Sequence, residues 1–307
     1  MRELSQITGL STAGVSYALR GQRVSAETQA RVQAAADRIG FRSDPIARAL
    51  RGGRTELVGV VGGSLADHWH QQFVARLQGA LRRHGLRMVL ADAAGDAQEE
   101  LALARDLADR RVDGLIVLPI DPAAADWRAI AAATPTVSVN ASLPAPAGSI
   151  RFNSAPGIAL ALDHLTGLGH TRIVVLGGGR HITPRRAGLR RVRCDVSSDR
   201  GQAAARRVLG GANPPTAVFA LADSIAYGVY AAARELGLTV PGDVSVVGFD
   251  DIPISRLLDP ALTAVGWDTP LAAVSAAEML VSAIEGRTPG EVVIEPELHV
   301  RASTAAL

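Results

Sequence analysis

The first forty residues carry their apolar side chains at helical spacing and show no strand-like alternation of apolar and polar positions. Leu4 and Ile7 predict a short first helix, which Gly9 ends. Ser11 or Thr12 is placed to cap a second helix. The buried face expected for that second helix consists of Val15, Ala18 and Leu19.

A third helix is expected from about Ala26 to Ile39, because Ser25 is a favourable N-cap residue. Thr28 stands where a capping box would have Glu. Two short helices around a glycine turn, braced by a third, form a helix-turn-helix arrangement. The same pattern also fits a small helical cap on a larger domain.

From residue 57 onward, short β-branched runs alternate with helical stretches. The expected strands are 57–61, 87–90, 114–118, 136–139, 172–176, 216–220 and 244–247, and the expected helices include 73–84 and 99–109. Such alternation implies parallel sheets with right-handed crossovers. Residues 57–150 and 152–264 form two similar sets, so we expect an α/β fold with a ligand cleft at the C-terminal ends of the strands.

Composition excludes several classes of protein. The chain has 307 residues, of which 48% are hydrophobic, and this favours a well-filled α/β core over one small module. No apolar run approaches the ~18 to 20 residues of a membrane span, and the N-terminus has no export-signal pattern, so we expect a cytoplasmic protein. The single cysteine, Cys194, excludes internal disulfides and a cysteine-based zinc site.

The formal net charge of +2 is divided unevenly along the chain. Residues 1–56 contain nine arginines and five acidic residues, a formal charge of +4, and the rest of the chain carries −2. This asymmetry is expected of a protein that contacts a polyanion with one end.

The head resembles that of the LacI/GalR family of bacterial transcription regulators. The resemblance lies in residues 9–21 (GLSTAGVSYALRG), 24–25 (VS), 40–41 (GF) and 46–51 (IARALR), which have the family's order and spacing. It implies a second helix that lies in the major groove of DNA. The implied DNA contacts are Ser11, Thr12, Ala13, Ser16, Tyr17, Arg23, Arg48 and Leu50.

Three of these residues are expected at base edges. Thr12 offers a hydrogen bond, Ala13 packs on a thymine methyl, and Tyr17 offers a ring and a hydroxyl. The contacts expected at phosphates are Ser11, Ser16 and Arg23.

Residues 44–51 resemble the family's hinge helix, which is too short to be stable alone and folds when two copies pair on DNA. Leu50 matches the leucine that family members insert into the minor groove, although it also fits an ordinary linker hydrophobe. The head departs from the family pattern at three places. The family often has Arg in place of Tyr17, Thr in place of Gly14, and several residues ahead of the position of Met1.

The body resembles the same family in residues 110–116 (RRVDGLI), 165–173 (LTGLGHTRI), 215–219 (PTAVF) and 244–251 (VSVVGFDD). The resemblance implies a core built like a periplasmic sugar-binding protein, with two subdomains and a small-molecule effector between them. The implied effector contacts are Asp67, His68, Trp69, Asn140, Arg185, Asp223, Phe249, Asp250 and Trp267.

The side chains suit a sugar. The indole of Trp69 stacks on a sugar face, Asp67 or His68 binds hydroxyls, and the fork of Arg185 suits diols or carboxylates. A capping or loop-fixing role is the alternative for five of these residues: Asn140, Arg185, Asp223, Asp250 and Trp267.

Two departures bear on the effector. Ala222 stands where relatives have Asn, and the stretch from Gly188 to Ala204 is shorter than usual. A helix and part of a strand are expected to be missing there. The pocket is then either reshaped or no longer responsive to an effector.

Other chemistry is weakly indicated. Residues 177–179 (GGG) lack the third glycine of a dinucleotide site and the lysine of a P-loop. His68 and His70 have no convincing third metal ligand, and no nucleophile elbow is present. We therefore expect no enzyme, cofactor or metal.

The sequence predicts a homodimeric DNA-binding regulator, most simply a repressor, that reads a pseudo-palindromic operator and responds to a carbohydrate-like effector. The alternative is a solute-binding sensor whose DNA-binding head is degenerate. The expected units are a head over 1–43, a hinge over 44–56 and a core over 57–307. The core is expected to divide into an N-subdomain (57–151 with 268–292) and a C-subdomain (152–267 with 293–307).

Overall fold

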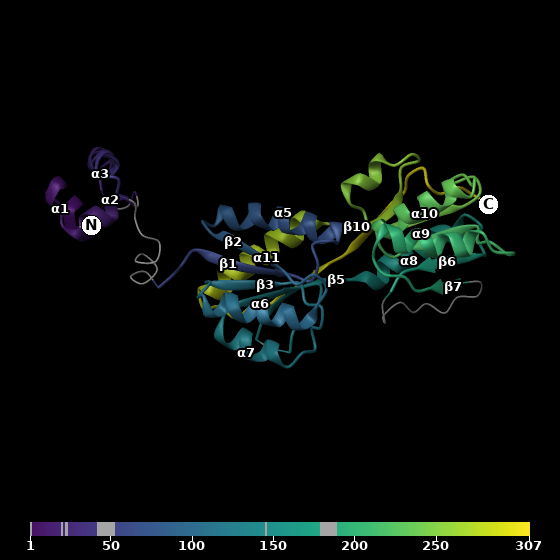
Figure 1. Ribbon diagram of the computed structural model, residues 1–307, viewed down its shortest axis with the longest axis horizontal. Helices are drawn as coiled ribbons and strands as arrows, with labels where there is room; N and C mark the ends of the chain where they lie inside the picture. Colours follow the sequence, from purple (N-terminus) through teal and green to yellow (C-terminus); the bar gives the residue numbers. More distant parts are fainter. Residues whose placement is uncertain (1, 20, 22–23, 42–52, 145, 179–188) are drawn as a thin grey trace. The chain divides into compact units, whose positions relative to one another are not determined.

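The computed structural model describes residues 2–19, 21, 24–41, 53–144, 146–178 and 189–307. The chain divides into two compact units, Met1–Thr55 and Glu56–Leu307, which are described separately (Figure 1). No helix in the described ranges is long and apolar enough to cross a bilayer.

The first unit contains three helices, α1 (Arg2–Thr8), α2 (Thr12–Leu19) and α3 (Ala26–Arg38). Their shared core confirms the predicted helical spacing. Its buried residues are Leu4, Val15, Ala18, Val32, Ala35 and Ala36. The predicted caps are also present: Ser11 Oγ accepts the N–H of Gly14 at 3.1 Å, and Ser25 Oγ accepts that of Thr28 at 3.2 Å. Gly9 adopts φ +71° at the turn between α1 and α2, a conformation that favours glycine.

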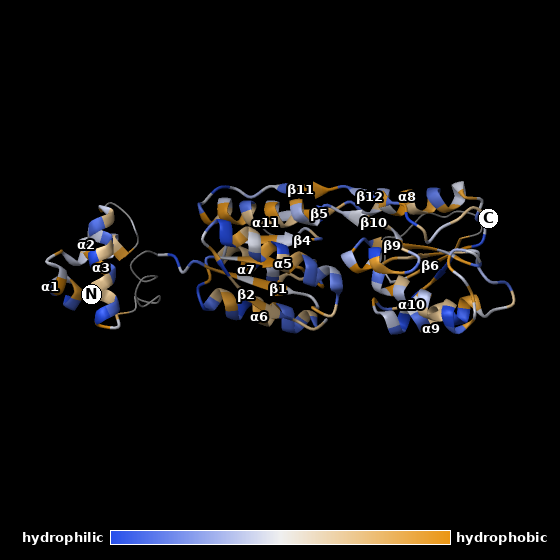
Figure 2. Cartoon of the chain, turned by 90° about the horizontal axis from the view of Figure 1, so that it is seen from above, coloured by the Kyte–Doolittle hydropathy of each residue, from blue (hydrophilic) through white to orange (hydrophobic). Residues whose placement is uncertain are grey.

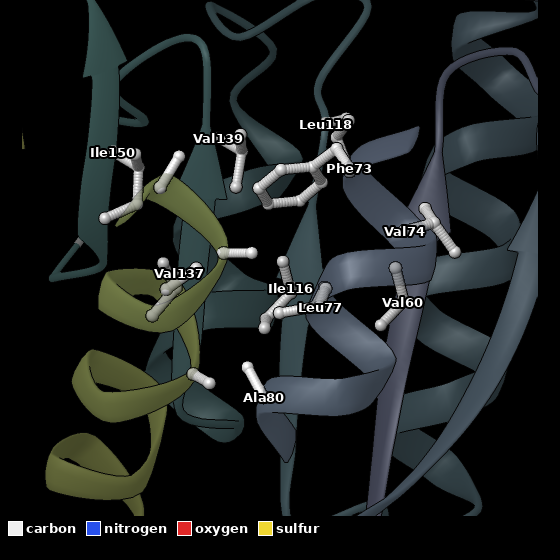
Figure 3. Close-up of a cluster of buried hydrophobic side chains, with 14 of the residues drawn as sticks. Val60, Phe73, Val74, Leu77, Ala80, Ile116, Leu118, Val137, Val139 and Ile150 are labelled. Atoms are coloured by element: carbon white, nitrogen blue, oxygen red, sulfur yellow. The ribbon is translucent and has the colours of Figure 1, made fainter. Parts of the chain in front are cut away.

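The first lobe of the second unit is a six-stranded parallel sheet in the order β11-β5-β4-β3-β1-β2. Its strands are β1 (Leu57–Gly62), β2 (Arg87–Asp92), β3 (Gly114–Val117), β4 (Thr136–Val139), β5 (Gly148–Phe152) and β11 (Glu291–Ile294). The helices α5 (His68–Arg83) and α11 (Thr269–Ile284) cover one face, and α6 (Ala97–Asp109) and α7 (Asp126–Ala133) cover the other. Figure 3 shows the first of these interfaces, where Phe73 and Leu77 of α5 pack over Ile116 and Val137 of the sheet.

The second lobe is a six-stranded sheet in the order β12-β10-β9-β8-β6-β7, parallel except where β12 runs antiparallel to β10. Its strands are β6 (Ile173–Leu176), β7 (Leu189–Val192), β8 (Ala217–Ala220), β9 (Ser245–Asp250), β10 (Thr263–Trp267) and β12 (Pro296–His299). The helix α8 (Ser154–Gly167) covers one face, and α9 (Ser198–Leu209) and α10 (Asp223–Glu235) cover the other. A short 3-10 helix, η1 (Pro253–Leu257), follows β9. Apolar residues concentrate between these sheets and helices (Figure 2).

The chain crosses between the lobes three times, after β5, after β10 and between β11 and β12. The last crossing comes at Glu295, because β11 pairs with β5 as far as Ile294. The predicted subdomain boundary between 292 and 293 therefore falls inside β11.

The shortened stretch after β6 still contains an edge strand. All four residues of β7 pair in parallel with β6. Only residues 177–188 connect these two parallel strands.

Candidate functional site

The helix α2 turns one side into the core of the first unit and leaves its N-terminal turn open to solvent. Val15 and Ala18 are buried. The predicted DNA contacts occupy the other sides: Ser11, Thr12 and Ala13 are exposed, and Ser16 and Tyr17 are half-buried. This is the end of a recognition helix that meets base edges in helix-turn-helix proteins.

Four of the predicted contacts fall in the gaps of the described chain. Arg23, Arg48, Leu50 and Arg185 lie outside the described residues.

The two lobes border a cleft of about 660 Å³. Its walls come from the start of α5 and the ends of β4 and β5 in the first lobe, and from α8 and the ends of β8, β9 and β10 in the second. Six predicted effector contacts line it: Asp67, Trp69, Asn140, Phe249, Asp250 and Trp267.

Each lobe brings one carboxylate to the cleft. Asp67 Oδ1 accepts the N–H of Trp69 at 2.8 Å and so caps α5. Asp250 Oδ1 accepts the indole N–H of Trp267 at 3.4 Å. Burial raises the pKa of Asp250 well above its ordinary value; the carboxylates of Asp223 and Asp67 add to the rise, and the Trp267 hydrogen bond opposes it.

A continuous chain of aromatic rings crosses the cleft region from one lobe core to the other. Trp69 lies parallel to Phe73, with ring centroids 5.5 Å apart. The successive contacts from Trp69 are Trp69–Phe152 at 5.0 Å, Phe152–Trp267 at 5.1 Å, Trp267–Phe249 at 5.5 Å and Phe249–Phe219 at 6.1 Å. Phe152 and Trp267 end the two strands after which the chain changes lobe, so their rings lie at two of the three crossings between the lobes.

Asp223 does not line the cleft, contrary to the prediction. It is the first residue of α10, and its side chain is turned beneath the loop after β9, where it is 1% exposed. Its Oδ2 accepts the N–H of Ile252 at 2.9 Å and the hydroxyl of Ser255 at 2.5 Å. Burial raises the pKa of Asp223 to about 7. The carboxyl therefore holds the β9–η1 loop in place.

Asp251 follows Asp250 in the sequence, and its carboxylate forms ion pairs with two arginines. Its Oδ1 lies 2.6 Å from Arg301 Nη1, and its Oδ2 lies 3.0 Å from Arg256 Nη2. The charge of Asp251 is therefore balanced within the second lobe.

His68 is also absent from the lining, and His70 takes its place. The N-cap Asp67 and His70 lie three positions apart, on one side of the first helical turn, whereas His68 is exposed. His70 Nδ1 lies 2.8 Å from the carbonyl oxygen of Ser64. Within the described ranges, no three His, Cys, Asp or Glu side chains are grouped to hold a metal ion.

Sequence analysis missed a block of lining residues at the end of β5. These are Arg151, Phe152, Asn153 and Ser154. They were missed because β5, which contains Arg151 and Phe152, mixes small, apolar and charged residues and has no β-branched run. The signal that could have found them is the polar pair after Phe152, at the carboxyl end of a parallel strand.

Comparison with known proteins covers both units. Residues 162–304 match the family described as periplasmic binding protein-like domain. The HTH-type transcriptional regulator reg1 of Streptomyces lividans is 35% identical, over 100% of this chain and 96% of its own length. The chain belongs to the LacI/GalR family of transcription regulators.

Solved structures of this family agree with the fold. The crystal structure of the lac repressor dimer bound to operator and the anti-inducer ONPF matches with a TM-score of 0.84 and 27% identity, covering 99% of this chain and 98% of that one. The transcriptional regulator CelR in complex with cellobiose matches with a TM-score of 0.71 and 25% identity, covering 98% of each chain. The chain is therefore a transcription regulator and not an enzyme.

Proposed function

We propose that this LacI/GalR-family protein is a repressor that binds a pseudo-palindromic operator as a homodimer and is modulated by a sugar or sugar derivative in the cleft. The observation that carries the proposal is a chain that joins an exposed recognition helix to a cleft bordered by two lobes. Its working units are the head (1–43), the hinge (44–56) and the core (57–307). We place the protein in the cytoplasm, with its operator.

In the proposed complex the start of α2 enters the major groove. Thr12, Ala13 and Tyr17 read base edges, and Ser11 and Ser16 hold phosphates. The family resemblance adds three contacts from the rest of the head and the hinge: Arg23, Arg48 and Leu50.

Apolar residues left exposed in the second unit support a homodimer. The strand β2 is an edge strand of the first sheet and presents Val89 and Leu90, each 39% exposed. In the second lobe, Leu257 of η1 is 81% exposed. A second copy of the chain covers such surfaces, and two-fold symmetry matches the symmetry of a palindromic operator.

In the cleft, the indoles of Trp69 and Trp267 offer flat apolar faces, and Asp67, Asn140 and Asp250 offer polar groups for hydroxyls. The relative CelR was solved with cellobiose, which supports a carbohydrate-like ligand. The resemblance adds Arg185 as a contact. Ligand binding shifts the lobes about the three crossings and changes operator affinity; couplings of this kind are typically about 1 to 3 kcal/mol.

The proposal is tested by measuring operator affinity by fluorescence anisotropy, with and without mono- and disaccharides that the chain binds. We expect at least one bound sugar to change the operator Kd by about fivefold or more. A sugar that saturates the cleft while the operator Kd stays unchanged would contradict the proposed regulation.

A further inference from the structure

The charges in the described lining of the cleft are unbalanced. Asp67 and Asp250 each contribute an acidic side chain, and a ligand cation beside Asp250 would favour its ionised form, which burial opposes. Arg151 is the only arginine in that lining, and its Nε lies 3.1 Å from Oε1 of Glu291, outside the cleft. His70 directs Nδ1 to the carbonyl of Ser64. The neighbouring residue Asp251 differs from Asp250, because its carboxylate forms ion pairs with two guanidinium groups of its own lobe.

The walls around these carboxylates are aromatic. Trp69, Phe152, Phe249 and Trp267 all line the cleft, and their rings contact one another in sequence. The faces of such rings attract cations, most strongly in surroundings that exclude water. Carboxylates beside aromatic faces therefore form an environment that favours a positively charged group over a neutral one.

Trp69 adds a second requirement. Its side chain is 7% exposed, and its Nε1–H has no acceptor among the described residues. A buried donor without a partner is unfavourable, so a ligand that supplies an acceptor gains affinity. A hydroxyl oxygen is such an acceptor.

We propose that the effector is a hydroxylated primary amine, an amino sugar being the simplest form, whose ammonium group lies between Asp67 and Asp250. The indole faces of Trp69 and Trp267 flank that ammonium, and a ligand hydroxyl accepts from Trp69 Nε1. This inference rests on the proposed function, in which the same cleft holds the effector. A neutral sugar also fits the aromatic walls, but it leaves the two acidic side chains without a counter-charge among the described residues of the lining.

The test compares sugars that differ only in an amine. D-glucosamine is paired with D-glucose, and D-galactosamine with D-galactose, in titrations of the full chain followed by tryptophan fluorescence, at a pH where the amines are protonated. We expect at least one amino sugar to bind tenfold or more tightly than its neutral partner. The preference should shrink as salt is added, because the discrimination is electrostatic.

Two variants remove the charge while keeping the local hydrogen bonds. In Asp67→Asn the side-chain oxygen still caps α5, and in Asp250→Asn it still accepts from Trp267. Each variant should lower amino-sugar affinity about tenfold more than it lowers neutral-sugar affinity. The matched control is Asp199→Asn, an exposed carboxylate of α9 that does not line the cleft, which should change neither affinity.

Equal binding of an amino sugar and its neutral partner would overturn the amine assignment, and so would a preference that survives both variants. A chain that binds its operator but none of the amino sugars would overturn it as well. These outcomes differ from a failure of the proposed function, which would show as an unchanged operator Kd when a ligand occupies the cleft.

Discussion

At the residue scale, the side chains that support the cleft are as informative as those that line it. Asp67 caps α5 and still reaches the cleft, whereas Asp223 stands at a similar place after a strand and points beneath a loop. Glu100 of α6 has a comparable supporting role. It is 1% exposed, and its two carboxylate oxygens accept the N–H of Ile120 at 3.0 and 3.2 Å. It therefore fixes the loop after β3, at the strand ends of the first lobe.

Glu100 should make stability depend on pH. Burial raises its pKa from 4.5 to about 7, although the Ile120 hydrogen bond opposes the rise. Between these values the folded chain binds more protons than the unfolded chain, so stability falls as pH rises through this window. Glu100→Gln lacks this contribution. The difference in unfolding free energy between wild type and variant should therefore change by about 3 kcal/mol from pH 4.5 to 8.

The measurement is thermal unfolding of the full chain across that pH range. Glu99→Gln is the control, because Glu99 is the exposed neighbour on the same helix. Parallel stability curves for wild type and Glu100→Gln would show that Glu100 titrates normally.

At the element scale, strands that are buried on both faces of a sheet can be predicted from the sequence, because such a strand needs a continuous run of apolar residues. The strands β1, β3, β4, β6 and β8 are of this kind and were found. The strand β7 has the sequence LRRV, and its pattern is partly exposed, so periodicity gives no signal there. The start of α5 was placed five residues late because its first turn carries two polar residues outside the core: His68 is exposed, and His70 lines the cleft.

The same limit applies to the site. Of the nine predicted cleft residues, six line the cleft and Arg185 lies outside the described residues. Sequence order does not tell whether a strand-end carboxylate turns toward the cleft or beneath a neighbouring loop, and this decided between Asp250 and Asp223. The direction of a side chain is fixed by helix register and loop packing, which are tertiary properties.

Gly14 gives a prediction about the recognition helix. It lies inside α2, and a Cβ at this position would meet Ser11 Oγ at 3.4 Å and Leu10 Cβ at 3.5 Å, both ordinary contacts. Gly14→Ala should therefore stabilise α2 by about 0.5 to 1 kcal/mol. Amide hydrogen exchange in α2 should slow by about two- to fivefold.

The matched control is Gly79→Ala, a helical glycine of α5 with no atom within 4 Å of the added Cβ. It should leave exchange in α2 unchanged. Faster exchange in α2 of Gly14→Ala would mean that the close approach near Ser11 outweighs the gain in helix propensity.

At the scale of the whole molecule, the second unit consists of two lobes joined at three crossings, and the aromatic chain links the lobe cores at two of them. Phe152 stands between Trp69 and Trp267, each contact with centroids about 5 Å apart. A movement of one lobe therefore displaces rings packed against the other. This arrangement couples an occupied cleft to the relative position of the two lobes.

Phe152→Leu should weaken that coupling. The variant keeps an apolar side chain but breaks the ring contacts on both sides, which are worth about 0.5 to 1.5 kcal/mol per pair. We expect nearly unchanged operator affinity without ligand and a smaller ratio of operator Kd values with and without ligand. Trp127→Phe, at a buried aromatic residue outside the ring chain, is the control. If the ratio of operator Kd values with and without ligand is the same in Phe152→Leu as in the wild type, the aromatic rings do not carry the coupling.

The central claim is that the chain reads a specific DNA sequence as a dimer. It is tested most directly by incubating the full-length protein with a random library of DNA duplexes at near-physiological salt and sequencing the bound fraction. Our account predicts an enriched palindrome whose half-sites change when Thr12 or Tyr17 is substituted, with a flexible pyrimidine-purine step at its centre. A folded chain that enriches no sequence, or a motif without two-fold symmetry, would contradict it.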